Sequence, residues 1–403
     1  MLQVVNEAPG PEPAMAIYAE LLPNIQQVSV AAALSSPSDA STSAEVVDAG
    51  RRIRIRHRGH ALAVELPAAV AASTALPLPR TSCSYLTWRL SAAALDARAL
   101  PSTPENQAIP WASPDLQLGS VVSCRTCGNE IVPRDQIKVW KDLPSENWAE
   151  MMEFWHCHKP NDSGKPDDEA LADRAYGANS AIAARPGVGF VDVTSFMFCE
   201  PDCHHLLFSP SPSETMFRSS SLALDQITTS GPGHVFCGEC RTQVGLFATS
   251  CTSISLFKWQ ITCETLSPGR IPDLVECLAA TLLAAISRSA CAKSVVAPYV
   301  SEGGKGSKAL HLWVLNANMV YTSSARQGKR AAMKMLYREI SLDEGHDLVD
   351  SLTSNVQDIS LPKRAIEAVR RALEASTALM PERERSFKDW RAGLLDRWAT
   401  EVQ

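Results

Sequence analysis

The sequence has no apolar run long enough to cross a membrane. Its longest apolar stretch, residues 274–286, is interrupted by Glu276 and is far shorter than the roughly 20 residues that a spanning helix needs. The first residues also lack the basic segment and apolar core of a secretory leader. We therefore expect no membrane association and a location in the cytoplasm, the nucleus or both.

The sequence also lacks an excess of basic residues. Its net charge of -6 argues against a broadly basic nucleic-acid-binding domain. One local exception is the alternation of Arg52, Arg54 and Arg56 with isoleucines, which makes one face of a predicted strand basic. Such a row could contact phosphates, but a solvated sheet face is the commoner explanation. Direct nucleic-acid binding is not expected.

Motifs of common small-molecule active sites are missing as well. The glycine-rich segment at residues 303–306 lacks the strand, spacing and Ser/Thr context of a phosphate-binding loop. No serine stands in a nucleophile elbow. The sequence therefore shows no conventional small-molecule site.

What the chain does contain is the pattern of an ordinary folded protein. Its 403 residues are 45% hydrophobic and 20% charged, which is enough to build several cores. The first third alternates short apolar runs with turn-forming stretches, as antiparallel β domains do. The last third predicts a helix from about residue 273 to 289, a strand pair near residues 311–321, and two closing helices. The apolar faces of those two helices are Ile366, Val369 and Leu373 in one and Phe387, Trp390, Leu394 and Trp398 in the other.

These patterns predict an α+β chain in three parts. Residues 1–115 form an N-terminal antiparallel β domain, residues 116–268 a central zinc-stapled β-rich region, and residues 269–403 a C-terminal α/β region ending in helices. Residues 159–176 of the central region are dominated by polar residues, Pro and Gly. We expect this stretch to be a mobile insertion.

Twelve cysteines in a chain without a leader suggest metal ligation and core filling rather than disulfides. Two CxxC pairs stand out, although 109 residues (128–236) separate them: Cys124 with Cys127, and Cys237 with Cys240. Together they predict one four-thiolate zinc site with a structural role, because four cysteines leave no open position for substrate. Gly128 and Gly238 suit the positive φ of such turns. The alternatives are a redox dithiol or buried free thiols.

A second cluster of cysteines and histidines also falls in the central region. It comprises His156, Cys157, His158, Cys199, Cys203, His204 and His205. These residue types could hold a second zinc or present a reactive thiol beside a histidine. They could equally be core cysteines with surface histidines.

Several strings give the chain a family resemblance. They are Trp-Lys-Asp-Leu-Pro-Ser-Glu-Asn-Trp at residues 140–148, Phe-Trp-His-Cys-His at 154–158, and His-Leu-Trp-Val-Leu-Asn at 311–316, beside the two CxxC pairs. Over nearly its whole length the chain resembles ubiquitin-conjugating-enzyme-binding proteins with a HECT-like domain, most closely the fungal members.

The resemblance implies a ubiquitin-protein ligase that binds a ubiquitin-conjugating enzyme (E2) and promotes transfer of ubiquitin to lysines of a client protein. Family links to mRNA 3′-end processing factors suggest one kind of client. The resemblance also places the E2 contact at residues 237–261. There an alternating strand with Ile254, Leu256 and Lys258 would present a rigid edge.

The catalytic residue of a HECT ligase has no counterpart at its usual place. A HECT ligase carries ubiquitin on a cysteine in a Leu-Pro-x-x-x-Thr-Cys context near its C-terminus, but here Leu361-Pro362 leads into Lys-Arg-Ala-Ile and no cysteine follows Cys291. If a thioester forms, Cys157 is the first candidate nucleophile and Cys203 the second. The alternative is a non-catalytic, zinc-stabilised binding or assembly factor for a client protein, for example in mRNA 3′-end processing.

Overall fold

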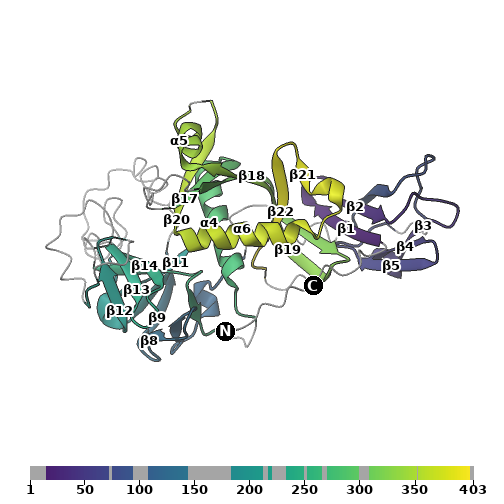
Figure 1. Cartoon of the computed structure of the whole chain (residues 1–403). Helices are drawn as coiled ribbons and strands as arrows, with labels where there is room; N and C mark the ends of the chain where they lie inside the picture. The colour runs from purple at the N-terminus through teal and green to yellow at the C-terminus, as the bar shows by residue number, and fades with distance from the viewer. Residues whose placement is uncertain are drawn as a thin grey trace, which may run out of the picture. The chain divides into compact units, whose positions relative to one another are not determined.

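The computed structural model describes residues 15–71, 75–93, 108–143, 183–211, 217–219, 233–248, 252–265, 270–298, 308–351 and 353–399. The chain divides into two compact units, which are described separately (Figure 1). Unit 1 combines Met1–Ala108 with Leu282–Gln403, and unit 2 is Ile109–Thr281. Both are rich in strands and the described residues include three α-helices, so the predicted α+β class is confirmed. The insertion predicted at residues 159–176 lies outside the described residues.

A nine-stranded sheet forms the body of unit 1. Its strands are β1 (Met15–Leu22), β2 (Gln27–Leu34), β6 (Tyr85–Ser91), β17 (Lys293–Pro298), β18 (Lys308–Ser323), β19 (Arg326–Ser341), β20 (Val356–Leu361), β21 (Ser386–Phe387) and β22 (Trp390–Asp396). Seven of them follow the order β21-β22-β19-β18-β1-β2-β6, while β17 pairs with β18 and with β20. The long strand β18 thus has β19 along one edge and shares its other edge between β17 and β1.

This sheet combines strands from the first and the last third of the chain, although the sequence predicts separate domains for these two parts. Strand β1 pairs antiparallel with β18, with Tyr18 opposite Ser323. The antiparallel strands predicted for the first third are present, but their apolar alternation specifies which face is buried and not which strand lies alongside.

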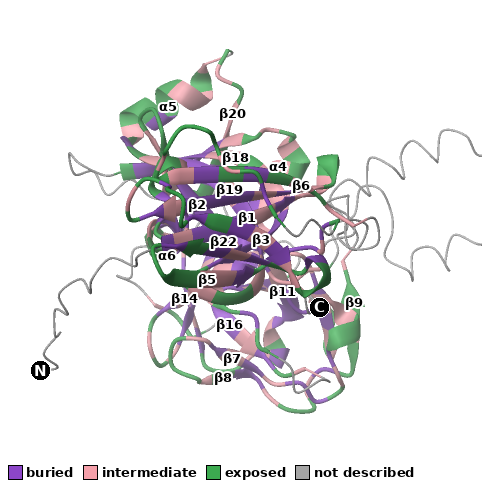
Figure 2. Cartoon of the chain, turned by 90° about the vertical axis from the view of Figure 1, so that its right-hand side faces the viewer, coloured by how far each residue is buried: buried purple, intermediate pink, exposed green. Residues whose placement is uncertain are grey.

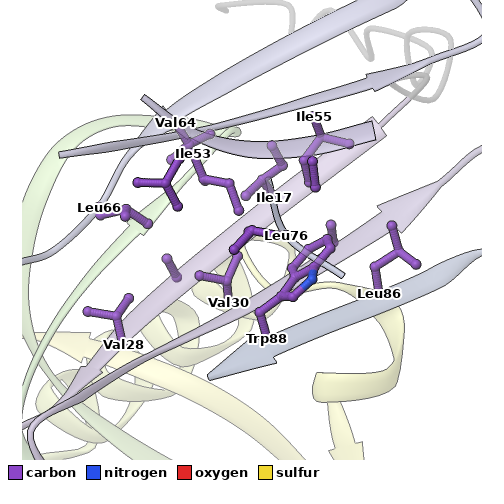
Figure 3. Packing of buried hydrophobic residues seen from close by; sticks show 14 of the residues in the cluster. Ile17, Val28, Val30, Ile53, Ile55, Val64, Leu66, Leu76, Leu86 and Trp88 are labelled. Atoms are coloured by element: carbon purple, nitrogen blue, oxygen red, sulfur yellow. The ribbon is translucent and has the colours of Figure 1, made fainter. Parts of the chain in front are cut away.

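A small three-stranded sheet lies over the N-terminal strands. It consists of β3 (Ser43–Val47), β4 (Arg52–His57) and β5 (His60–Glu65). Figure 3 shows Ile53, Ile55 and Val64 of this sheet directed toward Ile17 of β1 and Val30 of β2. Burial of these branched side chains supplies the driving force that holds the two sheets together.

Two helices of unit 1 flank its sheet: α5 (Leu342–Asp350) and α6 (Lys363–Thr377). In α6, Ile366, Val369 and Leu373 are buried, so the helix predicted from their spacing is confirmed. Helix α6 packs on β22. Figure 2 shows that buried residues concentrate in the strands, whereas α5 keeps much exposed surface.

The prediction of a second closing helix is wrong. Residues 386–396 form the hairpin β21–β22 instead. Phe387, Trp390 and Leu394 recur at helical spacing, but the chain reverses at Lys388, which has a φ of +53°. Strand β22 then pairs with β19, placing Leu394 opposite Lys334. The long-range partner overrides the local period.

Unit 2 contains two sheets. The larger has the order β12-β13-β14-β15-β11-β10-β9 and the smaller β16-β7-β8. The strands are β7 (Val122–Cys124), β8 (Glu130–Val132), β9 (Val139–Asp142), β10 (Val188–Val191), β11 (Ser195–Cys199), β12 (Leu206–Ser209), β13 (Gly233–Cys237), β14 (Gln243–Ala248), β15 (Ser253–Phe257) and β16 (Ile261–Cys263). Helix α4 (Leu274–Ser289) begins in this unit and ends in unit 1. Within the described residues, every helix is too short or too polar to traverse a bilayer.

Candidate metal centre

Four cysteine thiols converge in unit 2. Cys124 ends β7 and Cys237 ends β13, and each is followed three residues later by the second cysteine of its pair. The four sulfur atoms lie within 4.8 Å of one another. The Sγ–Sγ distance is 3.7 Å between Cys124 and Cys240 and 3.6 Å between Cys127 and Cys237. Tetrahedral zinc with bonds of about 2.3 Å places its sulfurs about 3.8 Å apart, so these thiols fit such an ion.

The two CxxC turns share one backbone arrangement. The N–H of Gly128 donates to the carbonyl oxygen of Cys124 at 2.8 Å, and the N–H of Arg241 donates to that of Cys237 at 3.0 Å. Gly128 has a φ of +74° and Arg241 a φ of +59°, so the left-handed residue follows the second cysteine in both turns. Gly238 does not take the positive φ expected of it. It is required for space, because a Cβ there would lie 2.8 Å from the carbonyl oxygen of His205.

The cysteine cluster joins the two sheets of unit 2. Cys124 belongs to the three-stranded sheet, whereas Cys237 belongs to the seven-stranded one. The N–H of His204, just before β12, also donates to the carbonyl oxygen of Ile131 in β8. A metal held by all four thiols would therefore cross-link two sheets from distant parts of the sequence.

Neighbouring polar groups influence the charge of these thiols. Burial raises the pKa of Cys124 to about 12. Burial acts the same way on Cys240, but its hydrogen bonds with the hydroxyl and backbone of Thr242 and with the thiols of Cys127 and Cys124 outweigh it and lower the pKa to about 7. The side-chain amide of Asn129 donates to the sulfur of Cys237 at 3.9 Å. Donors placed at sulfur favour the thiolate form that metals bind.

Arg125, inside the first CxxC turn, anchors the cluster to the rest of unit 2. Its N–H donates to the carbonyl oxygen of Gln260 at 2.9 Å. Its guanidinium lies 3.4 Å from the carbonyl oxygen of Lys258, 3.9 Å from the sulfur of Cys277, and 5.7 Å from the ring centroid of Trp111. The sequence gives no signal for this role because every partner is distant along the chain.

The strand expected to contact an E2 lies inside the unit. Strand β15 runs between β11 and β14, so it has no free edge. Ile254 and Leu256 of β15, and Lys258 directly after the strand, are each at most 1% exposed. Among the described residues of 237–261, Glu239 and Arg241 of the second CxxC turn are exposed, as is Thr252 just before β15.

The structure describes only one of the two candidate nucleophiles, Cys203. Cys157 lies outside the described residues. Cys203 lies between β11 and β12, and burial, then the charge of Asp202, raises the pKa of its thiol well above the usual range. A nucleophilic cysteine needs a lowered pKa, so the surroundings of Cys203 do not activate it. Its assignment stays a prediction without support from the local electrostatics.

The described residues of the second cluster of cysteines and histidines do not form a metal site. Asp202 is buried and accepts hydrogen bonds from the side chain of Gln136 at 2.8 Å and from the N–H of Gly187 at 2.7 Å. Over the described ranges, the four CxxC cysteines are the one group of ligating side chains close enough to hold an ion. His156 and His158 lie outside those ranges, and a second zinc stays a prediction.

The basic row on β4 is partly paired with acidic neighbours. Arg54 and Arg56 share Glu45 at 3.4 and 3.1 Å, and Arg52 pairs with Asp48 at 3.7 Å. These ion pairs are at the surface, where each contributes little stability. The three arginines thus share two carboxylates, and the expectation that this row is a solvated sheet face stays a prediction.

Comparison with known proteins gives the family. The family described as "HECT-like Ubiquitin-conjugating enzyme (E2)-binding" matches residues 20–392. The chain belongs to this family. The match extends through strands of both units, and it agrees with the resemblance carried by the sequence strings.

Two fungal proteins are similar to the chain. One is the "Uncharacterized protein YJR141W" of Saccharomyces cerevisiae, which is 23% identical over 287 residues, covering 70% of each chain. Another is the "Uncharacterized protein C1734.10c" of Schizosaccharomyces pombe, 39% identical over 54 residues, which are 12% of this chain and 15% of that protein. No solved structure matches the chain.

Proposed function

We propose that this HECT-like family member is a ubiquitin-protein ligase that binds an E2 charged with ubiquitin and promotes transfer of ubiquitin to lysines of a client protein. The observation that carries this proposal is the family match across residues 20–392. Zinc at the four-cysteine cluster would have a structural role, because a site with four thiolates has no position open to substrate.

The ligase we propose positions the charged E2 and forms no thioester of its own. Outside the metal centre, burial raises the pKa of four described cysteines: Cys199, Cys203, Cys263 and Cys277. Thiols of raised pKa are poor nucleophiles at neutral pH. Ubiquitin would then pass from the E2 thiol directly to the lysine amine, and Cys157 remains the candidate for a covalent route.

The two CxxC turns are the surface we propose for the E2. Thr126, Cys127 and Gly128 of the first turn and Glu239 and Arg241 of the second are exposed. The cysteines of both turns meet at the metal centre, which would hold the two turns in fixed geometry. A rigid surface loses little entropy on binding.

A single-turnover assay tests the proposal. An E2 preloaded with ubiquitin is mixed with free lysine, with and without the full-length chain, and the loss of the E2 thioester is followed. We expect faster discharge with the chain and no reductant-sensitive ubiquitin adduct on it. Glu239→Arg should slow discharge at unchanged metal content, whereas the control Glu382→Arg, at an exposed site in unit 1, should not.

Two outcomes would change the conclusion. An adduct that disappears in Cys157→Ala would show a covalent route. Equal discharge rates with and without the chain, for every E2 tested, would favour the second candidate function, a non-catalytic assembly factor for a client. The absence of any cysteine after Cys291 is the observation that favours that candidate.

A further inference from the structure

Three aromatic side chains lie on one face of the nine-stranded sheet in unit 1. Phe387 stands opposite Trp390 in the β21–β22 pair, and the ring centroid of Trp390 is 6.0 Å from that of Trp313 in β18. Phe387 is 52% exposed, and the two tryptophans are half-buried. We refer to Phe387, Trp390 and Trp313 as the aromatic row. The opposite face of β22 is covered, since Gly393 lies against Leu373 of α6.

Each ring of the aromatic row has a cation above it. The charged groups and their distances to the ring centroids are Lys293 at 4.9 Å over Trp313, Arg338 at 5.0 Å over Trp390, and Lys388 at 5.6 Å over Phe387. Arg338 also pairs with Glu344 at 3.1 Å. Among the residues that the structure describes, neither lysine has a carboxylate within ion-pair distance. The surface therefore carries positive charge without a complete set of counter-charges.

A buried donor beside the row also lacks an acceptor. His311, opposite Arg338 in the β18–β19 pair, is only 3% exposed, and its ring is 4.6 Å from that of Trp390. Its Nδ1 lies 3.5 Å from the guanidinium of Arg338. Because a guanidinium only donates, Nδ1 accepts and the hydrogen is on Nε2. That Nε2 has no hydrogen-bond partner among the described residues, although buried polar groups are normally satisfied.

We propose that this face of unit 1 binds an acidic, extended segment of a partner protein. Carboxylates of the segment would meet Lys293 and Lys388, and its apolar side chains would pack on the aromatic row. Tryptophan and arginine are the side chains most often found at the energetic centres of protein interfaces. Two surface lysines without a carboxylate partner among the described residues call for anionic oxygen, so charge complementarity selects an acidic partner.

A single-stranded nucleic acid is the less suitable occupant. Successive bases stack on parallel ring faces, whereas Trp313 and Trp390 meet at an interplanar angle of 70°. The proposal goes beyond the proposed function, because the aromatic row lies in unit 1 and the CxxC turns lie in unit 2. It assigns this face to a client and not to the E2.

Fluorescence anisotropy on the full-length chain tests the proposal. The probe is a short fluorescein-labelled peptide of repeating Glu-Leu-Asp-Phe, compared with a Lys-Leu-Lys-Phe peptide and with oligouridylate. We expect the acidic peptide alone to bind, more weakly as salt is raised. Lys293→Glu and Lys388→Glu should each weaken it about fivefold, as expected for one surface charge pair. Arg371→Glu is the matched control, because its side chain is 73% exposed on α6.

Further measurements separate a binding defect from a folding defect. Lys293→Met removes the charge but keeps the stem over Trp313, so it should weaken binding less than Lys293→Glu while the melting temperature stays that of the wild type. With Lys293→Glu or Lys388→Glu in place of the wild type, the E2 should be discharged onto free lysine at the wild-type rate. This result separates the present proposal from the ligase proposal. The proposal fails if the acidic peptide does not bind, if oligouridylate binds more tightly, or if Arg371→Glu weakens binding equally.

Discussion

Lys258 places an ammonium group inside unit 2, where it is 1% exposed. Its Nζ donates to the carbonyl oxygens of Pro110 at 2.6 Å and Trp111 at 3.1 Å and lies 5.3 Å from the ring centroid of Phe196. Burial lowers its pKa from the usual 10.5 to about 8. Between these two pH values the unfolded chain binds more protons than the folded chain, so the contribution of Lys258 to stability increases as pH rises.

The first prediction uses Lys258→Met. As pH is raised from 8 to 10.5, the wild type should gain up to about 3 kcal/mol in its free energy of unfolding relative to the variant. Urea unfolding at several pH values measures the difference, in which effects of other titrating groups cancel. Parallel pH profiles for the two proteins would show that the pKa of Lys258 is the same in the folded and unfolded chains.

A second prediction at this scale concerns the metal. The purified chain should contain one zinc, and Cys124→Ser should contain none, whereas Cys291→Ser, outside the cluster, should keep it. Chelation should destabilise unit 2 by several kcal/mol, because four-thiolate sites bind zinc with on the order of 10 kcal/mol. Elemental analysis and thermal unfolding measure both effects. Two zinc ions in the wild type, falling to one in Cys124→Ser, would point to a second site involving the cluster at residues 156–205.

Single residues differ in how far the sequence predicts them. The CxxC spacing identifies the four cysteines because each pair is a local turn that presents two thiols together. Lys258 continues the alternation of Ile254 and Leu256, and only its contacts with Pro110 and Trp111, about 150 residues earlier in the chain, show how its charge is accommodated there. Gly238 was predicted for its backbone freedom, but it is needed for its small size.

At the scale of elements, the contact between α6 and β22 depends on a glycine. A Cβ on Gly393 would lie 2.9 Å from the carbonyl oxygen of Leu373, a backbone atom that cannot move aside. We expect Gly393→Ala to destabilise unit 1 by about 2 kcal/mol through overpacking. Gly345→Ala in α5 is the contrast, because its nearest neighbour is a methyl group of Val295 at 3.1 Å and alanine favours helix. It should be close to neutral, and equal shifts in melting temperature for both variants would contradict this explanation.

The same two elements show where periodicity succeeds and fails. In α6, Ile366, Val369 and Leu373 recur over about two turns and predict the helix correctly. Phe387, Trp390, Leu394 and Trp398 repeat the same spacing over a longer stretch, yet β22 forms a strand by pairing with β19. A helical period in the sequence therefore does not decide the structure of a segment when a neighbouring strand offers a pairing partner.

At the scale of the whole molecule, the pairing of β1 with β18 makes unit 1 discontinuous in sequence. Along the sequence, unit 2 lies between the two segments that make up unit 1. Composition and spacing predict the α+β class and the metal-bearing central region. They do not predict the shared sheet, because the pairing register depends on contacts between residues about 300 positions apart.

A partly buried ion pair provides the last prediction, since it joins the two halves of unit 1. Lys334 of β19 lies 2.7 Å from Glu20 of β1, with side chains 12% and 13% exposed, and 3.6 Å from Glu384. Lys334→Met would leave the Glu20 carboxylate without its cation, which should cost about 1.5 to 3 kcal/mol of stability.

The double variant Glu20→Gln/Lys334→Met separates the loss of this pair from a loss of packing. It removes both charges while keeping the side-chain volumes, and the hydroxyl of Tyr18, now 2.8 Å from Glu20, can still donate to the amide oxygen. We therefore expect the double variant to be more stable than Lys334→Met in urea unfolding. The single variant Glu20→Gln completes the comparison. If the stability losses of Glu20→Gln and Lys334→Met add up to the loss of the double variant, the two charges do not interact, and the ion pair does not help to hold the two halves of unit 1 together.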